Sequence, residues 1–313
     1  MTASDVSQRT VTNPTGMIEA PVGESRRSRR RRERAEVAAG RLSSPAASTI
    51  AIVIAVLWSI PTLGLFVTSF RTVDDIQGSG WWTALTSPLF SPYNYQAALV
   101  DSGLASNFVN TLVITLPAVL IPITLALLAA YAFAWIPFRG RSTLFVAVFA
   151  LQIVPIQVTL VPLLNLYVDA GVAGSFWTVW LSHSMFALPL AIFLLHNFMK
   201  DVPPSLIEAA RMDGAGHVTI FFKVLLPLLV PAIAAFGVFQ FLWVWNDLLV
   251  ALTFASNDAT PLTARVADLA GTRGNAWYLL SAGAFLTMLV PLVVFIGLQR
   301  FFVRGLLAGS VKG

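Results

Sequence analysis

The chain has 313 residues, of which 57% are hydrophobic and only 11% are charged. A water-soluble domain usually carries about a quarter charged residues, so this composition indicates that lipid is the main surrounding of the chain. The sequence contains no cysteine, which excludes disulfides and cysteine-ligated metal centres. None of the three histidines has another histidine four positions away, so a histidine metal site is not expected either.

The positive charge is concentrated near the amino terminus. The formal net charge is +5, and nine of the twenty Lys and Arg residues lie before residue 42. This region holds the run SRRSRRRRER at 25–34 and has no aromatic residue, whereas nucleic-acid-binding surfaces combine basic and aromatic side chains on a folded face. We therefore expect no nucleic acid as a partner. We interpret residues 1–47 as a disordered, Arg-rich cytoplasmic tail that helps to orient the chain, with a specific lipid or protein contact as the alternative.

Apolar stretches dominate the rest of the chain. Spanning a hydrocarbon core of ~30 Å takes about 20 helical residues, and each stretch is that long. We therefore predict an all-α integral membrane protein with six transmembrane helices in a domain over residues 48–302. The predicted spans are 48–70, 107–136, 143–167, 173–199, 224–254 and 276–300. Prolines inside these spans predict kinks or breaks, with the freed carbonyls satisfied by neighbouring helices.

The loops indicate the orientation of the chain. With the amino terminus inside, the cytoplasmic segments hold 17 Lys and Arg residues and the outer segments hold three, namely Arg71, Arg265 and Arg273. This asymmetry follows the positive-inside rule and places both termini, including a tail at 303–313, in the cytoplasm. Several tryptophans also lie near the predicted outer ends of the spans, as an aromatic belt requires.

The loop at 200–223, between the fourth and fifth spans, is predicted to form a short helical hairpin on the cytoplasmic face. Pro203 and Pro204 stop the preceding helix, and Ser205 with Glu208 three residues later is a capping-box pattern. Asp213-Gly214 is a turn signal. The loop has more apolar residues than a solvated segment needs, which favours a protein partner. These residues are Leu206, Ile207, Met212, Val218 and Ile220.

The same loop resembles the EAA loop of ABC-importer permeases. The pattern is Glu208-Ala209-Ala210, then Gly214, then Leu226-Pro227, with Val224 where the family usually has isoleucine. The carboxyl-terminal stretch from Gln299, Trp245-Asn246-Asp247 and Asn110-Thr111-Leu112 are similar to the carbohydrate-uptake branch, specifically the second, maltose-type permease of each pair. The resemblance covers residues 48–313.

This resemblance implies an ABC type I importer permease fold in a bacterial cell (inner) membrane. It implies a permease subunit that forms half of the translocation pore for a sugar or oligosaccharide. The implied partners are a second homologous permease, two ATP-binding subunits, an extracytoplasmic sugar-binding protein that docks on the outer segments 71–106 and 255–276, and membrane lipid. No cofactor is expected on this chain, and ATP and Mg²⁺ would be used by the partner ATPase.

The resemblance also assigns residues to the contact with the ATPase: Leu206, Ile207, Glu208, Ala209, Ala210, Met212 and Gly214. Other interpretations stay open. Glu208 can be only the reciprocal member of a capping box, Ala209 and Ala210 can be simply good helix formers, and Gly214 can serve the turn alone.

Four polar residues in the spans are candidates for the translocation path: Asn110, Gln152, Asn246 and Asp247. Asp247 is the only carboxylate within a predicted span, and such groups are functional candidates by default. At ~1.5 Å per residue it would lie about 30 Å along a continuous helix from Pro227, near the outer interface, so interfacial solvation is the alternative. The amides can instead hydrogen-bond helix to helix. We interpret His183 and His196 as structural or interfacial.

The chain is not expected to be an enzyme. It has no G-x-x-x-x-G-K-[ST] phosphate loop, and none of its three lysines follows a glycine. Two other functions remain as alternatives. An ion-coupled secondary transporter of a small polar solute needs ionisable groups at the membrane midplane, and often repeats in its two halves. A membrane anchor or scaffold needs neither proline-broken helices nor intramembrane amides.

Overall fold

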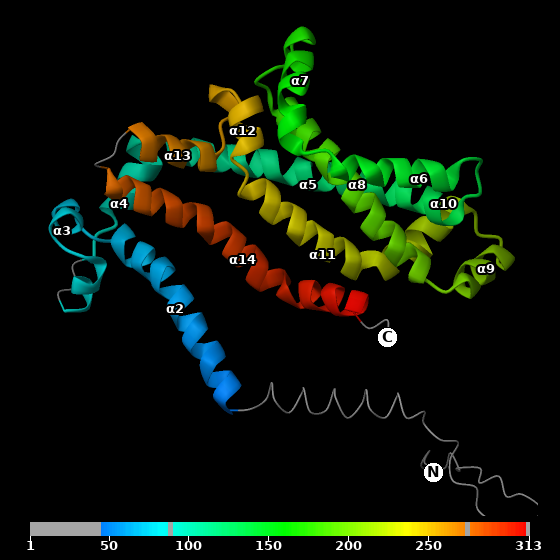
Figure 1. Cartoon of the computed structure of the whole chain (residues 1–313), viewed down its shortest axis with the longest axis horizontal. Coiled ribbons are helices and arrows are strands. Elements are labelled where there is room, and N and C mark those ends of the chain that lie inside the picture. Colours follow the sequence, from blue (N-terminus) through cyan, green and yellow to red (C-terminus); the bar gives the residue numbers. More distant parts are fainter. Residues whose placement is uncertain (1–44, 87–89, 273–275, 311–313) are drawn as a thin grey trace, which may run out of the picture. The chain divides into compact units, whose positions relative to one another are not determined.

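The computed structural model of the protein describes residues 45–86, 90–272 and 276–310 (Figure 1). The chain divides into two compact units, residues 1–63 and residues 64–313. Regular structure in the described residues is helical, apart from one isolated parallel bridge between Gly174 and Ala255. The predicted all-α class is therefore confirmed. The tail at 1–44 lies outside the described residues.

Five single helices are long and apolar enough to cross a membrane, and a sharply bent helix pair gives a sixth span if it is taken as one. The five are α2 (Pro45–Ser69), α5 (Leu104–Trp135), α8 (Phe176–Asp201), the run His217–Trp245 that ends in α11 (Leu226–Trp245), and α14 (Trp277–Ser310) up to Gln299. The predicted six-helix fold class thus agrees with the structure. Helix α14 continues to Ser310, so most of the predicted tail at 303–313 is helical in its backbone.

The third predicted span, 143–167, is not a continuous helix. It consists of α6 (Arg141–Ala150), a 3₁₀ turn η3 (Leu151–Ile153) and α7 (Ile156–Asp169), and the two parts meet at 98°. Figure 1 shows α7 turning away from the line of α6. Pro155 explains the break, because it restricts Val154 to an extended conformation (φ −70°, ψ 120°) in which the helix cannot continue.

The fifth predicted span, 224–254, differs at both ends. Its helical path begins earlier, through α10 (His217–Thr219) and a π-helical turn η4 (Ile220–Leu225). Helix α11 then ends at Trp245, and a short helix α12 (Leu249–Phe254) follows after a break. The break begins where the Asn246 amide donates to the carbonyl of Leu242 (2.8 Å), the kind of local bond by which asparagine competes with a helix.

Helices α5, α8 and α11 form the centre of the second unit. The most extensive helix–helix contact is between α5 and α8, and α11 lies against α5, α8 and α14. Small residues make the closest approach possible, since Ala126, Ala130 and Ala191 are fully buried. Aliphatic and aromatic side chains fill the remaining space, and the cluster extends down to Leu225 at the end of the 200–223 loop.

The prediction that neighbouring helices satisfy proline-freed carbonyls is confirmed in α5. Pro117 has no N–H for the carbonyl of Val113, four residues earlier, and the indole Nε1–H of Trp180 on α8 donates to that carbonyl (2.9 Å). The same arrangement recurs at two further prolines. In an environment without water, such a donor removes the large cost of an unpaired carbonyl.

The segment between α2 and α5 is a folded structure of short helices. It contains α3 (Val73–Gly78), the 3₁₀ turn η1 (Trp81–Leu85), α4 (Tyr93–Gln96) and the π-helical turn η2 (Ala97–Asp101). Arg71, one of the three predicted outer cations, is buried and donates to the carbonyls of Asp75 (2.7 Å) and Ser79 (3.0 Å). Its guanidinium also donates to the hydroxyls of Ser79 and Thr83, so Arg71 stabilises this segment from inside.

The segment after α12 is also ordered. It holds the 3₁₀ turn η5 (Asn257–Ala259) and α13 (Leu262–Thr272), which packs on α5 and α14. Leu104, Leu262, Leu279 and Ala282 form a separate core cluster there. The two predicted outer segments are therefore attached to the helices rather than being free loops.

Candidate functional site

Helix α9 (Pro204–Met212) forms the first limb of the 200–223 loop, and it starts one residue earlier than the capping box requires. Its N-cap is Pro203, in an extended conformation, and no side chain caps the helix. Pro204 occupies the first helical position, for which its fixed φ is preorganised. Ser205 therefore lies inside the helix. The predicted capping box with Glu208 is wrong, and the exposed Glu208 side chain is not used for it.

Gly214 ends α9 in a left-handed conformation (φ +81°). The N–H of Ala215 bonds to the carbonyl of Ala210 (2.9 Å), and the N–H of Gly214 bonds to that of Arg211 (3.0 Å). These two bonds are the Schellman pattern, which favours glycine because a Cβ is strained at this φ. The turn role expected for Gly214 is confirmed.

The 200–223 loop has a buried side and an exposed side. Ile207 is 2% exposed, and Ile220 and Phe221 are buried with it in the cluster that includes Met199. Ile207 is among the residues predicted to contact the ATPase. Its buried side chain is not accessible to a partner and instead anchors α9 in the hydrophobic core of the second unit. The local sequence around Ile207 does not predict this burial, because the cluster that encloses it includes Met199 of α8 and Ile220 and Phe221 of η4.

The exposed side of the loop keeps the other predicted contact residues. Met212 is 88% exposed and Val218 71%, and Leu206 and Phe222 are also exposed. Glu208, Ala209 and Gly214 are exposed as well, while Ala210 is half-buried against the core. Four large exposed apolar side chains on one helical hairpin are typical of a protein contact.

One side-chain bond ties the second limb of the loop to the membrane helices. The Tyr131 hydroxyl, on α5, lies 2.7 Å from Nδ1 of His217, at the start of α10. Tyr131 is buried and packs edge-on against His217 and Phe221. The sequence analysis did not assign a role to either residue. They are 86 positions apart, so only the fold brings them together.

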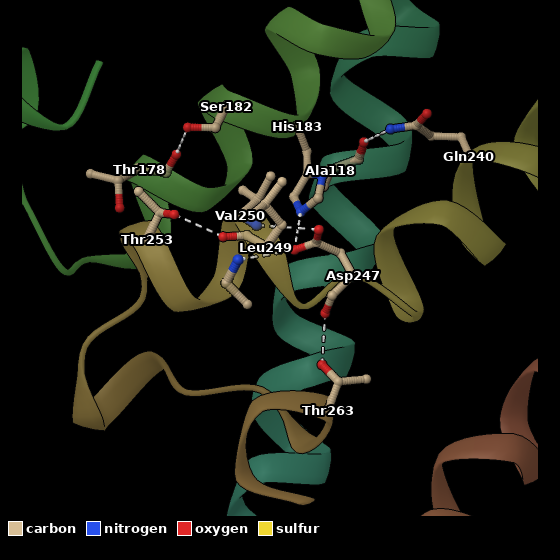
Figure 2. Close-up of polar contacts among 11 residues, drawn as sticks. Ala118, Thr178, Ser182, His183, Gln240, Asp247, Leu249, Val250, Thr253 and Thr263 are labelled. Carbon is tan, nitrogen blue, oxygen red and sulfur yellow. Dashed lines mark hydrogen bonds and ion pairs between the residues drawn. The ribbon is translucent and has the colours of Figure 1, made fainter. Parts of the chain in front are cut away.

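Asp247 is the centre of a polar junction made of Asp247, His183 and Thr263 (Figure 2). Its carboxylate accepts the N–H groups of Ala251 (2.9 Å) and Val250 (3.3 Å), so it caps α12. Its Oδ2 also lies 3.6 Å from Nε2 of His183 on α8. The helix break at 246–248, which the sequence analysis did not place, puts Asp247 at a helix start instead of along a continuous helix.

The polar junction joins three parts of the fold. His183 is buried and packs edge-on against Trp243 of α11, and the Thr263 hydroxyl of α13 donates to the backbone carbonyl of Asp247 (2.8 Å). The expectation that His183 is structural or interfacial named no partner for it. The two ionisable groups are 64 positions apart, and no local pattern links them.

The Asn110 side chain bonds to the backbone segment that precedes α13. Its amide donates to the carbonyls of Asp258 (2.9 Å) and Thr260 (3.1 Å), and Asn107 donates to Thr260 as well (2.9 Å). The Thr111 hydroxyl accepts the N–H of Leu262 (2.8 Å). The first turn of α5 thus holds the segment before α13 in place.

The remaining path candidates are exposed. Gln152 lies in the break between α6 and α7 and lines a cleft of about 820 Å³, together with Thr159, Met185 and Trp243. Asn246 is exposed, and its amide bonds to its own helix. Within the described residues, no group of three His, Asp or Glu side chains is placed to hold a metal ion.

Comparison with known proteins identifies relatives along most of the chain. Residues 122–307 match the family described as binding-protein-dependent transport system inner membrane component. The chain is 52% identical to the osmoprotective compounds uptake permease protein GgtD of Synechocystis sp., over 83% of this chain and 90% of that protein. It is 48% identical to the alpha-glucoside transport system permease protein AglG of Rhizobium meliloti, over 78% of this chain and 68% of that protein.

A solved structure has the same fold. It is the crystal structure of a bacterial ABC transporter involved in the import of the acidic polysaccharide alginate. A chain of that structure matches with a TM-score of 0.65 at 21% identity, over 83% of this chain and 98% of that one.

Proposed function

This chain belongs to the family of binding-protein-dependent transport system inner membrane components, and from that premise we propose that it forms half of a pore for a sugar or oligosaccharide. It is a permease subunit of an ABC importer, a non-catalytic membrane component. The other half of the pore is a second, homologous permease. The chain lies in the bacterial inner membrane with both termini in the cytoplasm, which the charge asymmetry of its loops supports.

The 200–223 loop is the part that engages the ATPase. The observation that carries this proposal is its exposed apolar side, formed by Leu206, Met212, Val218 and Phe222 and lying beside the exposed Glu208. The buried Ile207 and the Gly214 turn hold this side rigid, so a force on it reaches the membrane helices instead of deforming the loop. ATP and Mg²⁺ bind to the partner subunits, and this chain binds no cofactor.

A single-cysteine cross-linking experiment tests this contact. The chain contains no cysteine, so Met212→Cys and Val218→Cys each introduce the only thiol. In cells that import solute, a bifunctional reagent is expected to join these positions to an ATP-binding subunit, to an extent that changes when ATP is depleted. Leu85→Cys, exposed in η1 on the opposite side of the membrane, is the matched control and should capture no ATPase. Absence of the ATPase from the Met212→Cys and Val218→Cys products would disprove the contact.

The substrate is proposed to be a sugar, delivered by an extracytoplasmic binding protein that docks on the segments 71–106 and 255–276. The name of the 48% identical relative AglG supports this, because it is an alpha-glucoside transport system permease protein. Binding of radiolabelled sugars to the cognate binding protein, with an α-glucoside tried first and an amino acid as the comparison, identifies the class. Retention of the amino acid and no sugar would contradict it.

The ion-coupled alternative is separated by its energy source. The polar junction of Asp247 and His183 is the one feature that favours it, since buried ionisable groups are typical of ion-coupled carriers. Uptake into membrane vesicles is expected to require ATP and to persist when a protonophore dissipates the proton gradient. Uptake that stops with the gradient while ATP is kept constant would support the alternative instead.

A further inference from the structure

A fully buried amide on α11 bonds to a carbonyl that a proline in α5 has freed. Pro122 has no N–H for the carbonyl of Ala118, four residues earlier in the helix. The Nε2 amide of Gln240 donates to this carbonyl at 3.2 Å (Figure 2). Gln240 is 1% exposed and Ala118 0%, so water reaches neither group.

The arrangement recurs five residues later, at the last residue of α11. Pro291 in α14 frees the carbonyl of Thr287, and the indole Nε1–H of Trp245 donates to it at 2.8 Å. Trp245 is buried and stacks on Phe241. Two donors five residues apart on one helix thus bond to proline-freed carbonyls of two different neighbouring helices.

Helix α11 is also the helix that leaves the 200–223 loop. Residues from His217 to Trp245 form one span-length helical run, so a displacement of the loop acts along α11. Both proline-directed bonds lie in the distal part of that run. A hydrogen bond from α11 to a carbonyl of a neighbouring helix has a preferred length and direction, so it resists sliding of one helix along the other. Apolar contacts resist sliding less, because they are non-directional.

We propose that Gln240 and Trp245 are positioning residues through which α11 moves α5 and α14 during transport. The bonds to the carbonyls of Ala118 and Thr287 make the three helices move as one body. This rests on the proposed importer function, in which the ATPase acts on the 200–223 loop.

The simpler reading is that each donor only satisfies an orphaned carbonyl. The two readings separate when the carbonyl is given another donor. Replacing Pro122 by alanine restores the backbone N–H, which can bond the carbonyl of Ala118 within α5 itself. If Gln240 only satisfies the carbonyl, it becomes dispensable in that background. If Gln240 links α11 to α5, replacing it still lowers transport in the Pro122→Ala background.

The test compares Gln240→Leu, Pro122→Ala and the double variant in the complete transporter, reconstituted in proteoliposomes with its binding protein and ATPase. Gln240→Leu leaves a buried carbonyl unpaired, so the melting temperature of the complex should fall and ATP-driven uptake should drop about tenfold. In the double variant the melting temperature should return to that of Pro122→Ala. Uptake should stay low while ATP hydrolysis continues, so that more ATP is used per solute imported.

Recovery of uptake together with stability in the double variant would overturn the proposal, because the amide would then be only a cap. Wild-type uptake by Gln240→Leu would overturn it as well. Gln299→Leu is the matched control, since Gln299 is exposed and, among the described residues, its amide donates within its own helix to the carbonyl of Ile296. A failure of the importer function itself looks different, because the wild-type complex would then show no ATP-dependent uptake.

Trp245 allows a second, independent test if the Gln240→Leu chain does not assemble into the transporter complex. Trp245→Phe keeps an aromatic ring against Phe241 and removes the N–H, and Pro291→Ala supplies the carbonyl of Thr287 with a backbone donor. The same pattern is expected: stability restored in the double variant and the ratio of solute to ATP still reduced. Normal coupling in Trp245→Phe would remove α14 from the proposal.

Discussion

The 200–223 loop and the polar junction both lie at the ends of membrane helices, but different contacts shape them. The loop is shaped by neighbours in sequence, because the bonds that form its turn join residues three to five positions apart. The junction joins Asp247 to residues on α8 and α13, 64 and 16 positions away. The loop exposes large apolar side chains, whereas the junction largely buries its ionisable ones.

This difference indicates which substitutions should lower the stability of the protein and which should only weaken the coupling between ATP hydrolysis and transport. A junction of largely buried ionisable and backbone groups stabilises the fold, since removing one member leaves the others without a partner. An exposed hairpin contributes little stability, so changes there should alter transport first.

The largest expected effect is at the junction. Asp247→Ala removes the acceptor for two N–H groups at the start of α12 and the partner of His183. We expect a loss of about 3 kcal/mol of unfolding free energy, measured as a lowered melting temperature of the purified chain in detergent. Asp169→Ala removes an exposed carboxylate outside the junction, so it is the control and should melt like the wild type. Equal melting of both variants would show that the junction is not a stabilising structure.

A smaller effect is expected at the loop turn. Gly214→Ala has open space for the new Cβ, so its cost comes only from the left-handed backbone, about 1–2 kcal/mol. Gly216→Ala also meets nothing within 4 Å, and the backbone there has an ordinary φ of −76°. Pull-down of the ATPase should therefore weaken severalfold for Gly214→Ala and not for Gly216→Ala. Equal binding by both variants would show that the turn geometry does not control the contact.

Tyr131→Phe should have a still smaller effect. It removes one hydroxyl and its bond to His217, worth about 1 kcal/mol, and keeps the packing against Phe221. Because the bond ties the second limb of the loop to α5, we expect reduced solute-stimulated ATPase activity with a small change in melting temperature. Tyr93→Phe, at an exposed position, is the control. Normal stimulation in Tyr131→Phe would show that the loop is held by its apolar anchors alone.

The smallest effect on stability is expected for Glu208→Gln, within about 0.5 kcal/mol of the wild type. Glu208 is exposed and caps nothing, so the change removes only a charge that is available to a partner. ATPase activity and uptake of the assembled transporter measure the consequence. Full uptake and full stimulation by Glu208→Gln would show that the charge has no role in the contact.

Local features were predicted well, because their causes lie in neighbouring residues. The helical spans follow from runs of apolar residues, and the Gly214 turn follows from the Asp-Gly pair that ends a short helix. The capping box failed although it is local, since Pro204 competes for the first helical position and begins the helix before Ser205. Two valid local signals overlapped, and the proline decided the outcome.

Apolar length and loop charge in the sequence alone determined the number of spans, the helical class and the expected orientation. The burial of Ile207, the pairing of His183 with Asp247 and the bonds of Gln240 and Trp245 to proline-freed carbonyls were decided only by the tertiary structure. The physical reason is that a span needs only enough apolar residues to avoid water. The partner of a buried polar group, in contrast, depends on which distant helix brings a donor or acceptor within about 3 Å.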